Sequence, residues 1–331
     1  MGKIGLLANP ASGKDVRRLV ARASVFDNQE KRAIVRRVLV GATAGGCHSF
    51  VYHNDAHGII SQAIEEFGGT LDATPVESTQ MGTALDTISA ARAMRDAGCN
   101  LVVTLGGDGT NRAFCLGWPD APLLPISTGT NNVFPDLYEA TVAGAAAGLI
   151  TSQKIRDDFF LQQKCITVNI EGERDDFALI DALLTQEKFV GARALLKPQQ
   201  FSSALLTRAE PAAVGITSIG GLLHPVDARS DHGLWLEFGA GGQVVNAPIA
   251  PGLYEAVGVK SFQPLPLDQT VRCEGPGTLA FDGERERTLK PGQSATLTLT
   301  RKGPRVLNVQ AVLQRAAASG SFIYPASANG S

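Results

Sequence analysis

Short apolar runs and amphipathic segments alternate through the first half of the chain. Apolar runs bounded by glycine or polar residues are typical of buried strands, whereas apolar residues three and four positions apart predict helices. The expected strands are residues 4–8, 37–42, 71–77 and 101–105, and the expected helices are residues 16–23, 29–35, 59–67 and 86–97. We expect Asp86 to cap the last of these helices and Gly98 to end it. Such alternation predicts βαβ units and a parallel sheet.

Beyond residue 151 the pattern changes to short β-rich runs separated by Gly, Pro and Asp clusters. The expected strands there are residues 164–170, 177–184, 214–219, 234–238, 257–262, 277–281 and 294–300. We therefore expect an α/β fold class with two domains: an N-terminal parallel-sheet α/β domain (1–150) and a β-rich, sandwich-like domain (151–304). Residues 305–318 are expected to form a strand and a helix that return to the first domain, and residues 319–331 a loose tail.

A glycine-rich turn follows the apolar run 101–105 and reads Gly-Gly-Asp-Gly-Thr-Asn. Gly106, Gly107 and Gly109 have no Cβ, so the backbone is able to adopt positive φ and bring its amides close to an anion. A helix starting near Thr110 and Asn111 adds a favourable dipole for phosphate. Asp108 would repel a phosphate, so we expect it to hold a cation or to take a proton from an attacking hydroxyl. The alternative is a tight turn with a capping aspartate.

Two further loops follow predicted strands and carry small and hydroxyl residues. One contains Asn9 and Ser12, and the other runs Thr128-Gly129-Thr130-Asn131. Because the carboxyl ends of parallel strands meet at one edge of an open sheet, we expect all three loops to converge there. Other phosphate motifs do not fit. Ala8 and Asp15 break the P-loop pattern, and Arg112 stands where the dinucleotide-binding motif needs its third glycine.

Composition and charge limit which kinds of partner we expect. The chain has 331 residues, enough for two cores, and its net charge of -2 argues against nucleic acid as a partner. Its five cysteines have no Cys-x-x-Cys spacing, and no apolar run is long enough to span a membrane. We therefore expect a cytoplasmic protein with reduced thiols and no membrane partner.

The three loops together resemble the superfamily that joins NAD kinases with diacylglycerol and sphingosine kinases. The string Gly-Gly-Asp-Gly-Thr-Asn-Arg, the string Ser-Thr-Gly-Thr-Asn-Asn-Val-Phe and residues 189–195 are most similar to the ATP-NAD kinase-like group that includes acetoin catabolism protein X. The resemblance covers about residues 3 to 315 and implies a kinase fold, ATP and Mg²⁺ as cofactors, and a homo-oligomer. It also implies Asp108 as the catalytic residue. The residues implied in ATP binding are Asn9, Ser12, Gly106, Gly107, Gly109, Thr110, Asn111, Thr128, Gly129, Thr130 and Asn131.

The second domain supplies the remaining candidates. Phe281-Asp282-Gly283-Glu284 resembles the Asp-Gly-Glu element of the lipid-kinase branch, which implies a magnesium site at Asp282 and Glu284, although a turn between strands gives the same residues. Asp181 matches the acidic residue that NAD kinases use on the dinucleotide, so we assign it and Asn132 to the acceptor. Ile180 departs from the pattern because an asparagine is expected there, and this weakens NAD as the acceptor.

These observations favour ATP-dependent phosphoryl transfer to a hydroxyl, with NAD as the first acceptor to consider. A small hydroxylated metabolite of acetoin-type catabolism is the alternative acceptor, and a nucleotide-binding sensor without catalysis is the alternative class. His53 and His57 are four residues apart, with His48 close by, but the metal-binding Glu of a His-Glu-x-x-His motif is missing. Acceptor binding near the loops suits these histidines better than a metal. The sequence identifies neither the acceptor nor the oligomeric state.

Overall fold

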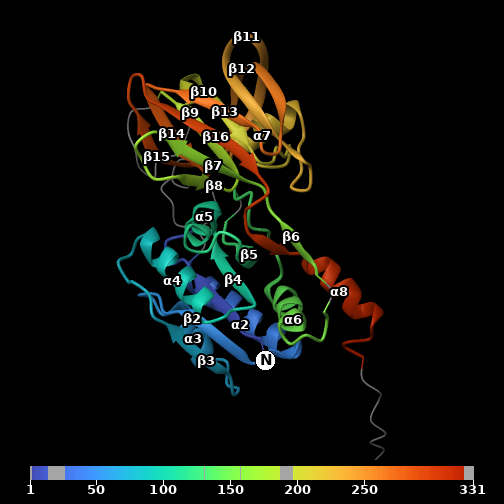
Figure 1. Cartoon of the computed structure of the whole chain (residues 1–331). Coiled ribbons are helices and arrows are strands. Elements are labelled where there is room, and N and C mark those ends of the chain that lie inside the picture. Colours follow the sequence, from blue (N-terminus) through green and yellow to red (C-terminus); the bar gives the residue numbers. More distant parts are fainter. Residues whose placement is uncertain (1, 14–26, 130, 157, 187–196, 324–331) are drawn as a thin grey trace, which may run out of the picture.

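The computed structural model describes residues 2–13, 27–129, 131–156, 158–186 and 197–323. It has two parts, and helix α5 (Asp108–Gly117) of the first part lies next to the second (Figure 1). The first part is built on a seven-stranded sheet in the order β3-β2-β1-β4-β5-β17-β6. Its strands are β1 (Ile4–Ala8), β2 (Ser49–His53), β3 (Asp72–Val76), β4 (Leu101–Gly106), β5 (Pro122–Ser127), β6 (Phe160–Gln162) and β17 (Arg305–Leu307). All are parallel to their neighbours except β6, which is antiparallel to β17.

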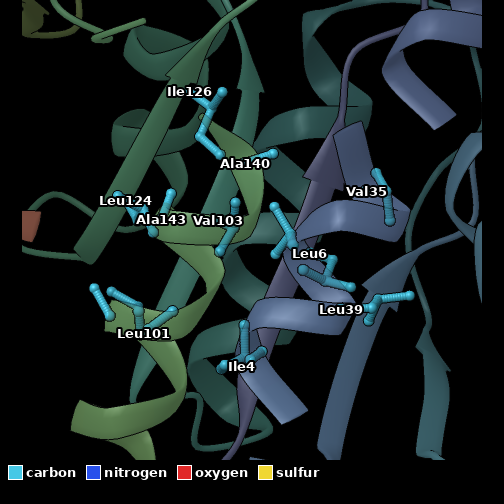
Figure 2. Packing of buried hydrophobic residues seen from close by; sticks show 14 of the residues in the cluster. Ile4, Leu6, Val35, Leu39, Leu101, Val103, Leu124, Ile126, Ala140 and Ala143 are labelled. Carbon is cyan, nitrogen blue, oxygen red and sulfur yellow. The ribbon is translucent and has the colours of Figure 1, made fainter. Parts of the chain in front are cut away.

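Helices cover both faces of this sheet because the central strands are apolar on both sides. Alternate residues of β1 and β4 pack against α2 (Asn28–Ala44), α3 (Ile59–Glu65), α6 (Ala140–Thr151) and α8 (Val309–Ala318). Figure 2 shows Ile4, Leu6, Leu101 and Val103 of this cluster beneath α2 and α6. The opposite face packs against α4 (Ala84–Asp96) and α5. Near-continuous apolar runs buried on two faces are typical of parallel sheets.

The second part consists of two antiparallel sheets, as expected for a β-rich domain. The six-stranded sheet has the order β12-β11-β10-β9-β14-β15 and the four-stranded sheet the order β13-β16-β7-β8. The strands are β7 (Cys165–Ile170), β8 (Asp176–Ala178), β9 (Asp181–Thr185), β10 (Phe201–Leu206), β11 (His232–Ala250), β12 (Leu253–Pro266), β13 (Thr270–Glu274), β14 (Gly277–Phe281), β15 (Glu284–Leu289) and β16 (Ser294–Thr300). A short 3-10 turn (Pro198–Gln200) and α7 (Ile216–Leu223) complete it. A second apolar cluster fills the space between the sheets.

Two expected strands are helices in the structure. Residues 37–42 belong to α2, whose buried residues Ile34, Val35, Val38 and Leu39 have helical spacing that continues through the expected strand. Residues 214–219 overlap α7, where residues 216–221 are all buried. In both cases a short apolar run is compatible with either element, and its packing partners decide which one forms.

Other differences concern boundaries. Strand β2 was not expected, and the expected strand 177–184 is broken between β8 and β9. The N-cap of α4 is Thr83, not Asp86. Asp86 is at position N3 of the helix, where it completes a capping box, and its carboxylate accepts from the amides of Met81 and Gly82. The expected helix 16–23 lies outside the described residues.

The chain crosses from the first part to the second after β6, at Gln163 and Lys164, and returns through β17. Strand β17 pairs with β5 in parallel, and α8 lies on the same sheet face as α6. None of the described helices is long and apolar enough to span a bilayer.

Helices α2 and α6 cross at glycines. A Cβ at Gly41 would collide with the carbonyl of Thr141, and one at Gly144 with the carbonyl of Val38. Gly45 and Gly148 repeat this arrangement one turn further along each helix. The close approach brings both helices down onto the sheet that carries the loops described below.

We expect Gly144→Ala to lower the free energy of unfolding by about 1 to 3 kcal/mol, because the added methyl group forces the two helices apart. Denaturant titration checks the value. As a control, Val142→Ala on the exposed side of α6 is expected to change it by less than about 0.5 kcal/mol. An unchanged stability for Gly144→Ala would mean that the helices are not in close backbone contact.

Candidate functional site

Three loops meet at the carboxyl edge of the first sheet. They follow β1, β4 and β5, which are adjacent strands. The side-chain amide of Asn9 donates to Thr110 Oγ1 at 2.8 Å, which joins the first loop to the second. Thr128 Oγ1 donates to Ser12 Oγ at 2.9 Å, which joins the first loop to the third. Residues from three separate motifs therefore form one polar surface.

The glycines of the glycine-rich turn allow close packing because they have no side chain. Gly107 is the N-cap of α5, with φ of -99°. Neither Gly106 nor Gly109 has positive φ, which corrects our reason for expecting glycine there. A Cβ at Gly106 would meet the side chain of Thr110, and one at Gly107 would meet the side chain of Asn132. These glycines thus let β4, α5 and the third loop approach one another.

Asp108 is the first residue of α5, and its carboxylate is held by the third loop. Oδ1 accepts from the amides of Val133 at 3.0 Å and Phe134 at 2.8 Å, and Oδ2 lies 3.1 Å from the same Val133 nitrogen. The helix N-terminus also favours a negative charge at this position. The side chain is consequently fixed in orientation.

One residue predicted to bind the nucleotide, Asn111, points into the fold. Asn111 is fully buried beneath the turn, where it accepts from Thr104 Oγ1 and donates to the carbonyl of Gly107. It supports the turn from inside the fold. The carbonyl of Gly129 accepts from Ser127 Oγ, and Asn132 donates to the same hydroxyl. Thr130 lies outside the described residues.

The second part contributes two aspartates to the same place. Asp282 lies in the turn between β14 and β15 at φ of 50°, and its carboxylate accepts from the amides of Leu179, Ile180 and Asp181 at 2.9, 2.7 and 3.2 Å. Both of its oxygens are therefore engaged with the backbone. Glu284 begins β15.

Asp181 is the carboxylate without such partners. It is buried, and its Oδ1 has no hydrogen-bond partner among the described residues. Asp181, Asp108, Asn131 and Asp282 line one cavity of about 90 Å³. The other lining residues are mostly apolar: Val133, Val214, Gly215, Ile216, Thr217, Ile249, Ala250, Pro251 and Gly283. The cavity thus joins the predicted catalytic, acceptor and metal residues.

Burial of three carboxylates together disfavours their ionised forms. Desolvation raises the pKa of Asp108 to about 7, with Asp282 adding to the rise and the amides of Phe134 and Val133 and the charge of Arg208 opposing it. Desolvation, Asp282 and Asp108 also raise the pKa of Asp181 well above its usual range. The pKa of Asp282 is raised by burial, although Arg112 and its amide bonds counteract this. Near neutral pH Asp108 can therefore accept a proton.

Two arginines tie the two parts together beside Asp108. Arg112, on α5, donates to Asp176 Oδ1 at 2.7 Å and to the carbonyl of Phe177 at 2.6 Å. It is therefore a contact between the two parts. Arg208 follows β10 and donates to the carbonyl of Val133 at 3.3 Å, with its guanidinium over the Phe134 ring. It therefore holds the same two residues whose amides hold Asp108.

The histidines do not form the helical pair that their spacing allows. His53 ends β2 and its Nδ1 lies 2.8 Å from Ser78 Oγ, whereas His57 is exposed in the following loop. Burial lowers the pKa of His53. Among the described residues, no three His, Cys, Asp or Glu side chains are arranged to bind a metal ion on their own.

Arg208 and Lys31 are the contacts that sequence reasoning missed. Lys31 is completely buried, and its ammonium group donates to the carbonyls of Asn9, Pro10 and Ser12. Neither residue belongs to a motif, and each acts on a segment distant in the sequence. Nothing in the sequence alone could have identified them.

The chain is similar to known proteins along its whole length. Residues 4–155 match the model of the ATP-NAD kinase N-terminal domain, and residues 164–302 match that of the acetoin catabolism protein X C-terminal domain. Acetoin catabolism protein X of Cupriavidus necator is 35% identical over 329 residues, which cover 95% of this chain and 92% of the relative. An uncharacterized protein of Archaeoglobus fulgidus is 27% identical over 135 residues, covering 41% of this chain and 37% of the relative.

Solved structures share the fold at low sequence identity. Yeast NADH kinase, solved in complex with NADH, has a TM-score of 0.54 at 14% identity and covers 100% of this chain and 90% of its own. A putative diacylglycerol kinase from Bacillus anthracis has a TM-score of 0.50 at 13% identity, covering 92% of this chain and 97% of its own. The arrangement of a parallel α/β part followed by an antiparallel β part is thus common to all three.

We expect the carboxyl group of Asp108 to titrate near pH 7, observable by NMR of aspartate labelled with ¹³C at Cγ and assigned with Asp108→Asn. Replacing Arg208 with Met removes a positive charge that lowers this pKa, so the midpoint should move to higher pH. Arg272→Met, at an exposed position on β13, should leave it unchanged. A downward shift or none for Arg208→Met would contradict the geometry.

Proposed function

This chain belongs to the family of acetoin catabolism protein X, and from that membership we propose that it is an ATP-dependent kinase that transfers the terminal phosphoryl group to a hydroxyl. One observation carries the proposal: the amides of Val133 and Phe134 hold the Asp108 carboxylate where the three loops meet the second part. The similarity of residues 4–155 to the ATP-NAD kinase N-terminal domain supports it. We propose a cytoplasmic homo-oligomer as its state in the cell.

Phosphoryl transfer depends mainly on positioning and charge neutralisation. We propose that Asn9, Ser12 and Thr128 bind nucleotide phosphates, since their hydroxyl and amide groups lie on the joined loops. Gly106, Gly107, Gly109, Thr110, Gly129, Thr130 and Asn131 complete the proposed nucleotide site. Asp108 accepts the proton of the acceptor hydroxyl as its oxygen bonds to the γ-phosphorus, while the bond from that phosphorus to the β-phosphate oxygen breaks and ADP leaves.

A magnesium ion fits the donor set when it arrives with the nucleotide. Proteins commonly hold Mg²⁺ through one or two carboxylates together with substrate phosphates, so a complete protein cage is not required. The buried, unpartnered Oδ1 of Asp181 supports a cation beside the cavity. Asp282 and Glu284 stay the proposed metal residues, although the carboxylate of Asp282 already accepts three amide bonds. When bound, the ion neutralises charge on the phosphates.

NAD is the first acceptor that we propose, with Asp181 and Asn132 as its contacts. The shared fold with yeast NADH kinase supports a nucleotide acceptor. A small hydroxylated metabolite is the second candidate, because Ile180 has its side chain in an apolar cluster and offers no polar contact to a dinucleotide.

We expect Asp108→Asn to lower kcat by about 10²- to 10⁴-fold, because the amide cannot accept the proton. Affinity for ATP should change little, since the amide oxygen can still accept from Phe134. Initial rates and calorimetric titration with ATP measure the two effects. Asp120→Asn, at an exposed position, is the control and should behave as wild type. Full turnover by Asp108→Asn would remove Asp108 from catalysis.

The acceptor is tested by transfer of labelled phosphate from ATP to NAD, to NADH and to a panel of small alcohols, diols and hydroxyketones. We expect transfer to at least one of them, with the Asp108→Asn variant as the blank. A product from NAD supports the first candidate, and a product from a small alcohol alone supports the second. Tight ATP binding without any product would contradict the kinase proposal and favour a nucleotide sensor.

A further inference from the structure

A buried lysine lies directly behind the first loop. Lys31 is in the first turn of α2 and is 0% exposed. Its Nζ lies 2.6 Å from the carbonyl oxygen of Ser12, 2.8 Å from that of Asn9 and 3.1 Å from that of Pro10, with Asn28 Oδ1 at 3.4 Å. One ammonium group thus donates to three backbone carbonyls of a loop that belongs to the proposed nucleotide site.

Burying a lysine here has an energetic cost. Removing an ammonium group from water costs several kcal/mol even in favourable surroundings, and buried charges are often replaceable by apolar residues without loss of stability. A cation near a helix N-terminus is also opposed by the helix dipole. The hydrogen bonds from Lys31 to the carbonyls of the loop offset part of that cost and tie the loop to α2.

The lysine determines which way the loop presents its polar groups. In a trans peptide the carbonyl and the following amide point in opposite directions. Because the carbonyl of Ser12 points at Lys31, the amide of Gly13 points away from it, and Gly13 has a left-handed φ of 76°. That amide has no hydrogen-bond partner among the described residues. A backbone amide next to a residue in this conformation is suited to bind an anion.

The loop is connected to the other two on its far side. Ser12 Oγ accepts from Thr128, and the Asn9 side chain donates to Thr110, so the polar side chains face the second and third loops. The carbonyls of the loop thus lie on the side of Lys31, and its polar side chains lie on the side of the other two loops.

We infer that Lys31 is a positioning residue of the nucleotide phosphate site, which turns the carbonyls of Asn9, Pro10 and Ser12 away from the phosphates and adds a positive charge behind the loop. This rests on the proposed function, because it assumes that a nucleotide binds at these loops. Lys31 does not touch the nucleotide. It acts through the loop backbone.

The test compares Lys31→Met with Lys164→Met in the full-length protein. Lys164 is a matched control: it is 3% exposed and its Nζ also donates to two backbone carbonyls, those of Asp227 and His232, but it lies in the second part. Calorimetric titration gives the affinities for ATP and for adenosine, which has no phosphates, and initial rates give KM for ATP and kcat.

For Lys31→Met we expect the Kd and the KM for ATP to rise about 10- to 100-fold, the loss of a charge-assisted interaction, while the Kd for adenosine and kcat stay within a few-fold. Lys164→Met should leave the ratio of ATP to adenosine affinity unchanged. Equal weakening of ATP and adenosine by Lys31→Met, or the same phosphate-specific loss in Lys164→Met, would overturn the inference.

A second measurement needs no variant and covers the case in which Lys31→Met does not fold. Inorganic tripolyphosphate should slow hydrogen exchange of the Gly13 amide in the wild-type protein, because that amide is expected to bind phosphate. Unchanged exchange at saturating tripolyphosphate would overturn the role given to the loop. If wild type binds ATP and Lys31→Met binds it equally well, only this inference fails; if wild type binds no ATP, the proposed function fails as well.

Discussion

The arrangement of the site depends on the hydrogen bonds between the Asp108 carboxylate and the amides of Val133 and Phe134. They join the start of α5 to the loop after β5, so separating the second and third loops would leave this buried carboxylate without its hydrogen-bond partners. An unpaired buried charge is costly, and this makes the junction rigid. Arg208 reaches the same two residues from the second part. One side chain, Asp108, is thereby held by elements from both parts of the molecule.

Opposed charges act on that carboxylate. Asp282 raises its pKa and Arg208 lowers it, and both belong to the second part. The protonation of Asp108 therefore depends on how the two parts fit together. Arg112 secures that fit through Asp176, which also accepts from Arg287 of β15. The contacts between the two parts and the protonation of Asp108 are therefore coupled, because charged side chains of the second part act on both.

Sequence patterns predicted the first sheet better than its connections. Strands β1 and β4 and helix α3 lie where their apolar patterns indicated, since fully buried strands and amphipathic helices leave a strong local signal. Strand β3 also lies in its expected range, although it is a largely exposed edge strand. The predictions of strands at residues 37–42 and 214–219 were wrong, because these apolar runs are too short to distinguish strand from helix without knowledge of their packing partners. Asp86 was misassigned by three residues because Thr83 and Asp86 both suit a helix start, and only the bonds decide which one caps it.

By itself the sequence determined the fold class and the three loops, because glycine, hydroxyl and asparagine residues directly after apolar strands are a local pattern. It also pointed to Asp108 as the one acidic residue in a phosphate-like turn. Only the tertiary structure decided that Asn111 faces inward, that Lys31 lies behind the first loop and that Arg208 meets the third. Each of these contacts joins segments whose approach depends on packing of the whole chain. Hydrogen bonds between distant segments leave no pattern in either segment alone.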